Sequence, residues 1–158
     1  MSQQEELIES FGTTYWLIGK FSDGMSHEDS VATPSFRTNS FNWVFGHILV
    51  SRDRALTLLG KETTLTAEER TLYETGSGPL SPESAVKLNR LLTALDASQE
   101  RISKGLSAAS DEDLAAIFDE SRNVTVGSRI AGLHWHETYH VGQLEILRQV
   151  NVEREAFP

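Results

Sequence analysis

The chain has 158 residues, of which 39% are hydrophobic and 23% charged, so it is long enough to form one globular domain over residues 1–158. Asp and Glu outnumber Lys and Arg by 23 to 14, and the resulting formal charge of −9 disfavours nucleic acid and anionic membranes as partners. Because cysteine is absent, disulfides, thiolate metal ligands and cysteine nucleophiles are excluded. Neither a leader peptide nor a membrane-spanning stretch is expected, and we predict a cytoplasmic protein.

Apolar residues at three- and four-residue spacings predict four long helices, at residues 2–21, 39–59, 81–106 and 125–150. Ser81 is the expected N-cap of the third helix, with proline at its first position. The connections are predicted to be loops, apart from a short helix near residues 67–73 and a turn-rich segment at 111–118. A short charged tail follows the last helix. No strand alternation is convincing, so the sequence predicts an all-α four-helix bundle.

Two of the five histidines, His136 and His140, lie one turn apart in the last predicted helix. Successive helical residues turn by about 100°, so these imidazoles fall within about 40° of each other and can bind one cation. By the same arithmetic, His134 points away from them. Gln143, one turn beyond His140, is placed to contact an imidazole or a bound ligand.

His47 is an isolated imidazole in the apolar run at residues 42–49. A lone core histidine is more often a hydrogen-bonded structural residue, but the pair on the last helix makes His47 the expected third ligand. Ser51 and Arg54 follow it on the same helix face, whereas Asp53 is rotated away and is expected at the surface. Three imidazoles leave a coordination position open for water or substrate, as in catalytic metal sites. Of the metals that suit imidazole, we expect zinc or nickel.

The same segment also satisfies the H-E-x-x-H pattern of zinc peptidases, in which the glutamate is the general base. The extended form of that pattern fails, because Gln143 and Ile146 stand where it requires glycine and histidine. No edge strand that would hold a peptide is apparent. A peptidase is therefore the weakest interpretation. Glu137 is expected either to support the neighbouring His136 from outside the ligand set or to lie on the flank of the helix.

Two segments resemble the signatures of the DinB-like (YfiT-like) superfamily. Residues 39–48 (NSFNWVFGHI) are similar to its N-terminal signature, and residues 136–144 (HETYHVGQL) to its C-terminal His-x3-His-x-Gly-Gln signature. The resemblance implies a four-helix bundle of up-down-down-up topology that is often a homodimer. It also implies a divalent metal bound by His47, His136 and His140.

The chemistry that this resemblance implies is less uniform than the fold. Relatives include S-transferases and isomerases that use a low-molecular-weight thiol such as bacillithiol or mycothiol, and others are described as metal-dependent hydrolases. We therefore expect a small-molecule thiol S-transferase or hydrolase. Arg54 or Arg129 is expected to hold a carboxylate of the thiol, unless it forms an ordinary ion pair. Three further side chains are expected to line the pocket: Ser51, Tyr139 and Gln143. The alternative is a non-catalytic metal-binding or stress-related dimeric bundle.

Overall fold

The computed structural model describes residues 1–36 and 38–151, and the predicted charged tail lies outside them. Within these residues, the long helices are α1 (Gln3–Ser22), α3 (Phe41–Leu58), α5 (Leu88–Ala108) and α7 (Val126–Asn151). The short helices are α2 (His27–Val31), α4 (Ala67–Leu72) and α6 (Asp111–Ala115). An antiparallel hairpin of β1 (Ile117–Asp119) and β2 (Val124–Thr125), with the 3₁₀ turn η1 (Glu120–Arg122) between them, leads into α7.

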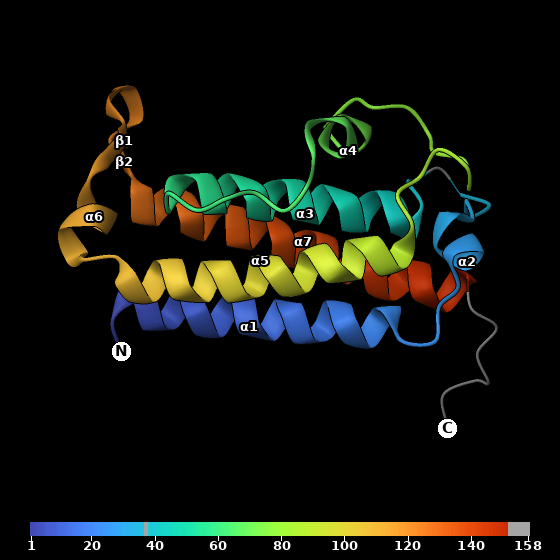
Figure 1. The fold of residues 1–158 in the computed structure, drawn as a ribbon, viewed down its shortest axis with the longest axis horizontal. Coiled ribbons are helices and arrows are strands. Elements are labelled where there is room, and N and C mark those ends of the chain that lie inside the picture. Colours follow the sequence, from blue (N-terminus) through green and yellow to red (C-terminus); the bar gives the residue numbers. More distant parts are fainter. Residues whose placement is uncertain (37, 152–158) are drawn as a thin grey trace.

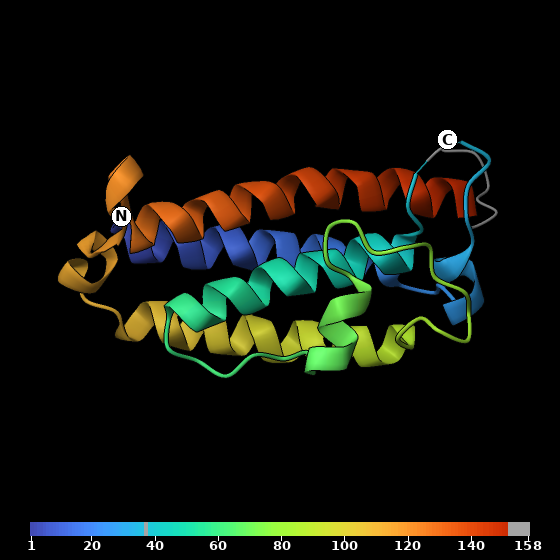
Figure 2. The same cartoon turned by 90° about the horizontal axis from the view of Figure 1, so that it is seen from above.

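The four long helices form the predicted all-α bundle, with the up-down-down-up topology. In Figure 1, α1 and α7 run in one direction and α3 and α5 run in the other. Both α5 and α7 pack against α1 and α3. Figure 2 shows that the connection from α3 to α5 runs along the side of the bundle, and α4 within it packs against α3. No helix in the described part of the chain is both long and apolar enough to span a membrane.

The third long helix begins later than predicted, at Leu88 instead of Ser81. A turn does form at Ser81, but the chain then leaves the helical path. The cause is a pair of hydrogen bonds to the backbone of Val86. Its N–H donates to the Tyr73 hydroxyl at 3.0 Å, and its carbonyl accepts from Nδ2 of Asn42 at 3.0 Å. Hydrogen bonds from distant residues therefore override a local capping signal.

Two further elements differ from the predicted ones. Residues 22–38, predicted as a loop, contain α2, which starts in a capping box formed by Ser26 and Asp29. The β1–β2 hairpin overlaps the predicted turn-rich segment, and Asn123, with φ 52°, adopts the left-handed conformation just before β2. Both elements are too short for a helical or strand periodicity to be visible in the sequence.

The buried apolar side chains form two clusters, one towards each end of the bundle. Between the clusters, each long helix contributes a buried polar side chain to one hydrogen-bonded network: Thr14 of α1, Arg52 of α3, Ser98 of α5 and Glu137 of α7. The core is therefore two apolar halves separated by a polar layer that includes two opposite charges.

All five N–H donors of the buried Arg52 guanidinium have acceptors. Nε and Nη2 donate to the two carboxylate oxygens of Glu137 at 3.0 and 2.7 Å. Nη1 donates to Ser98 Oγ at 3.2 Å and to Gln99 Oε1 at 3.1 Å, and Nη2 also donates to the carbonyl of Phe11 at 3.1 Å. A buried charge persists only when it is paired and hydrogen-bonded, so this network holds α3 in register with the other long helices.

We expect Glu137→Gln to destabilise the protein by about 3–5 kcal/mol, because the substitution leaves the Arg52 charge buried without a counterion. Urea unfolding followed by circular dichroism measures the effect. Glu145→Gln is the matched control, since Glu145 is an exposed residue of the same helix. Equal free energies of unfolding for the two variants would contradict this role of the ion pair.

Candidate metal centre

His47 of α3 and His136 and His140 of α7 bring their imidazoles together where these two helices pack. One nitrogen of each ring lies within 4.8 Å of those of the other two, and the Nε2 atoms of His136 and His140 are 3.1 Å apart. The ring centroids are 4.4–5.1 Å apart. His47 is buried, with 3% exposed, whereas His136 and His140 are half-buried, so the cluster opens to the surface on one side.

Each of the three imidazoles has a polar partner at Nδ1. For His47, His136 and His140 in turn, the partners are the Tyr73 carbonyl at 2.7 Å, Ser51 Oγ at 3.1 Å and Gln143 Oε1 at 2.7 Å. A carbonyl or amide oxygen only accepts, so Nδ1 of the first and third rings carries the proton and Nε2 keeps its lone pair. The serine hydroxyl can accept from the second ring in the same way. This is the arrangement by which metal-binding histidines are oriented.

The donor set fits a divalent transition metal. Tetrahedral zinc with Zn–N bonds of about 2.0–2.1 Å places its nitrogen ligands about 3.3 Å apart. The distance of 3.1 Å between the Nε2 atoms of His136 and His140 is close to that value. Three imidazole ligands also leave one position for water or substrate.

Two residues whose roles were not predicted from the sequence hold the His47 imidazole in place. The Tyr73 carbonyl bonds its Nδ1, and the Trp43 ring stacks on it with centroids 4.9 Å apart and an interplanar angle of 11°. Tyr73 is fully buried, which raises the pKa of its hydroxyl to about 12, and that hydroxyl donates to Asn42 Oδ1 at 2.8 Å. A Cβ atom on Gly46 would overlap the Tyr73 ring. A glycine inside an apolar helix was the available signal for this close approach.

The other predicted pocket residues fall into two groups. Ser51 and Gln143 contact the imidazoles directly, as described, and Tyr139, which is 59% exposed, packs edge-on against the His140 ring at 5.2 Å. Arg54 and Arg129 instead lie beside the cluster, where both line a neighbouring hollow.

Glu137 and Asp53 occupy positions that their predicted roles did not anticipate. The Glu137 carboxylate is turned into the bundle, where it accepts from Arg52 and Thr14, so neither oxygen is free to support His136. Asp53 was expected at the surface, and this is wrong: it is fully buried. The connection after α3 folds back over Asp53, whose oxygens accept from the N–H groups of residues 64 and 65 at 2.7 and 3.0 Å.

Burial makes the half-buried imidazoles poor bases. Desolvation, reinforced by the positive charge that His140, His47, Arg54 and Arg129 can carry, lowers the pKa of His136 to about 4. Desolvation also lowers the pKa of His140, although its hydrogen bond with Gln143 opposes the shift. Both rings are therefore neutral at physiological pH, which is the form that binds a metal.

The sequence profile of the DinB superfamily matches residues 19–144 of this chain. The chain belongs to the DinB superfamily. This confirms the resemblance seen in the two sequence signatures. Among solved structures, this DinB-superfamily chain is similar to that of a conserved protein from Enterococcus faecalis, with a TM-score of 0.76. The match covers 96% of this chain and 98% of that one at 17% identity, so the likeness concerns the fold. No curated protein sequence matches the chain significantly.

We expect Gly46→Ala to weaken metal binding without changing any ligand, because the new methyl group displaces Tyr73 and with it the acceptor for His47 Nδ1. Loss of such a supporting contact weakens metal affinity by about 10- to 100-fold. Zinc competition with a chromophoric chelator measures the change. Gly132→Ala is the control, since a Cβ atom there has open space around it. Equal affinities in the two variants would contradict this role of Gly46.

The metal-free protein is expected to lose stability as the pH falls from 6.5 towards 4. In this range the unfolded chain protonates His136, whose pKa is lowered to about 4 in the folded chain. The free energy of unfolding therefore falls with falling pH, and this contribution is constant above 6.5. Urea unfolding of chelator-treated protein across the range tests this, with His136→Asn expected to show a shallower dependence. An NMR titration that places the pKa of His136 near 6.5 would contradict the explanation.

Proposed function

We propose that this protein is a metal-dependent enzyme that binds one zinc or nickel ion through His47, His136 and His140. The observation that carries the proposal is the convergence of three imidazoles whose Nδ1 atoms are already bonded to Tyr73, Ser51 and Gln143. That pattern leaves the three Nε2 atoms for a cation. A purely structural cluster would not require three imidazoles from two helices to face one point.

The reaction that fits this site best is thiol S-transfer or hydrolysis of a small molecule. A bound divalent metal lowers the pKa of a coordinated thiol or water, which supplies a nucleophile to a chain that has no cysteine. Glu137 is unavailable as a general base because Arg52 engages both of its oxygens, which argues against peptidase chemistry. The exposed Tyr139 beside His140 is placed to contact the substrate.

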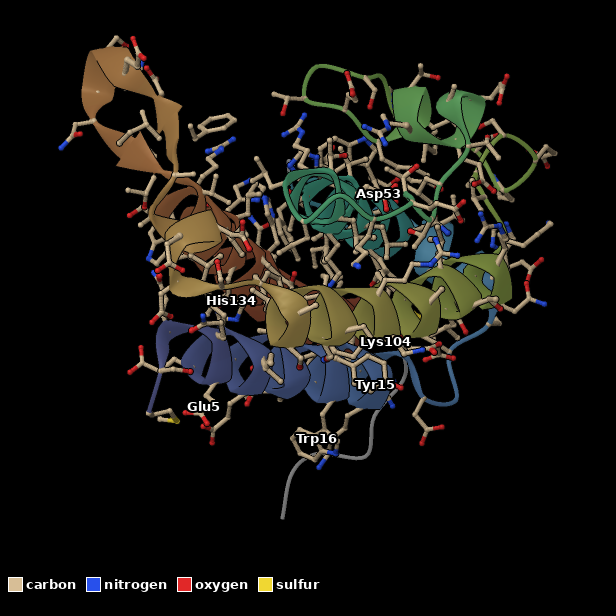
Figure 3. All side chains as sticks on the ribbon, turned by 60° about the vertical axis from the view of Figure 1, so that its left-hand side comes forward. Glu5, Tyr15, Trp16, Asp53, Lys104 and His134 are labelled. Carbon is tan, nitrogen blue, oxygen red and sulfur yellow. The ribbon has the colours of Figure 1, made fainter. Side chains whose placement is uncertain are left out.

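A non-catalytic dimeric protein is the second candidate, and exposed apolar side chains support its dimeric state. On α7 they form a stripe: Trp135, Tyr139, Ile146 and Val150 each expose about half or more of their surface. Trp16, 58% exposed, points away from the bundle on α1 (Figure 3). Large exposed apolar patches mark interaction surfaces, so we propose that this stripe supports the homodimer expected from the family.

Metal analysis of the purified, dialysed protein tests the proposed function. We expect about one zinc or nickel ion per chain and a metal-dependent rise in melting temperature, since a ligand that binds the folded state stabilises it. His47→Ala should abolish both. His27→Ala is the control, because the imidazole of His27 contacts the Pro82 carbonyl away from the cluster. Unchanged metal content in His47→Ala would overturn the proposed site.

Turnover separates the enzyme from the non-catalytic bundle. The metal-loaded protein is screened for conjugation of bacillithiol, mycothiol or glutathione to electrophiles and for hydrolysis of small esters and amides. Activity that His47→Ala and His140→Ala both lose supports the enzyme. Stoichiometric metal together with no turnover for any of these substrates favours the second candidate.

A further inference from the structure

A hollow of about 290 Å³ lies beside the imidazole cluster, between α3, α7, α4 and the β1–β2 hairpin. Apart from Thr57, its lining is of two kinds. The apolar side chains are Leu58, Phe118 and Leu133, and the basic ones are Arg54, Arg70 and Arg129. The chain carries only 14 Lys and Arg residues against 23 acidic ones, so three arginines around one small hollow form a marked local concentration of positive charge.

The guanidinium groups at this hollow are largely without protein counterions. In residues 1–36 and 38–151, neither Arg54 nor Arg129 forms an ion pair with a carboxylate. Arg129 lies over the face of Phe118, with its guanidinium carbon 5.9 Å from the ring centroid. Arg70 is 3.6 Å from Asp53, but that carboxylate already accepts from the backbone of the α3–α4 connection. Donors for an external anion therefore remain.

The hollow is lined in part by α3 and α7, the two helices that carry the imidazoles. Arg54 follows Ser51 by three residues on α3, and Leu133 precedes His136 by three residues on α7. Arg129 precedes His136 by seven residues, about 10 Å along the helix axis. A small molecule held in the hollow can thus reach the metal centre.

We propose that this hollow binds the oxyanionic group, a carboxylate or phosphate, of a small-molecule substrate whose other end lies at the imidazoles. Binding of the oxyanion is inferred from the hollow itself, whereas the position of the other end of the substrate at the imidazoles rests on the proposed function. Arginine holds such oxyanions through two parallel hydrogen bonds, and the apolar wall accommodates the adjoining part of the ligand. In a protein of net charge −9, these arginines gather positive charge where an anion must enter.

Equilibrium binding of simple probes tests the proposal, by calorimetry with both zinc-loaded and chelator-treated protein. The probes are benzoate, phenyl phosphate and the uncharged benzyl alcohol. We expect at least one anion to bind and the alcohol to bind about tenfold more weakly or not at all. Arg54→Gln and Arg129→Gln should each weaken anion binding by about tenfold. Lys104→Gln removes the same charge from an exposed position on α5 and should leave binding unchanged.

The variants separate this proposal from the proposed function. His47→Ala should lose the metal yet keep anion binding, because the arginines remain. If anion binding disappears in His47→Ala while Arg54→Gln and Arg129→Gln leave the anion affinity unchanged, the anion binds the metal and the subsite proposal is wrong. If the wild-type protein binds no metal but the two arginine substitutions weaken its anion binding, the subsite is supported and the proposed function is wrong. Equal binding of benzoate and benzyl alcohol also overturns the subsite.

Discussion

The buried ion pair between Arg52 and Glu137 constrains how the four long helices can pack. A guanidinium removed from water needs acceptors on every side, and here they come from α1, α5 and α7. These bonds require Glu137 to face the interior. Around the axis of α7, His136 lies about 100° from Glu137, and His140 lies about 60° from Glu137 in the same direction. This rotation turns both imidazoles towards His47 of α3. The pair that stabilises the core therefore also orients two of the three imidazoles.

The third imidazole is held from outside the four-helix core. His47 is fixed between the Trp43 ring and the Tyr73 carbonyl, and Tyr73 belongs to the connection between α3 and α5. That connection is anchored on α3 at two places, by buried Asp53 through residues 64 and 65 and by Asn42 through Tyr73 and Val86. The long connection is thus part of the site, and these hydrogen bonds hold it against the bundle.

The segment at residues 136–140 shows how one short motif can carry two unrelated roles. In a zinc peptidase its glutamate would act on a water at the metal, but here both carboxylate oxygens accept hydrogen bonds from Arg52 inside the bundle. The two histidines of this segment face the other way, towards His47. The cluster that the three imidazoles form opens to the surface beside a basic hollow. The direction in which each side chain points, set by helix rotation, therefore keeps this glutamate away from the imidazoles.

The sequence by itself determined the four long helices apart from the start of α5, the class of fold and the three histidines. Periodicity and residue type are local properties, so they can be recognised without knowledge of distant partners. The i+4 position from His47 and the i+3 position from His140 also indicated Ser51 and Gln143 as neighbours of the imidazoles. Only the tertiary structure decided the start of α5, the burial of Asp53 and the roles of Arg52, Glu137 and Tyr73. Each of these depends on a hydrogen bond to a residue outside its own helix or turn. From the sequence alone, a polar side chain is expected at the surface, because burying it without hydrogen-bond partners costs free energy. Burial becomes possible only when every donor and acceptor is satisfied, and those partners are visible only in the tertiary structure.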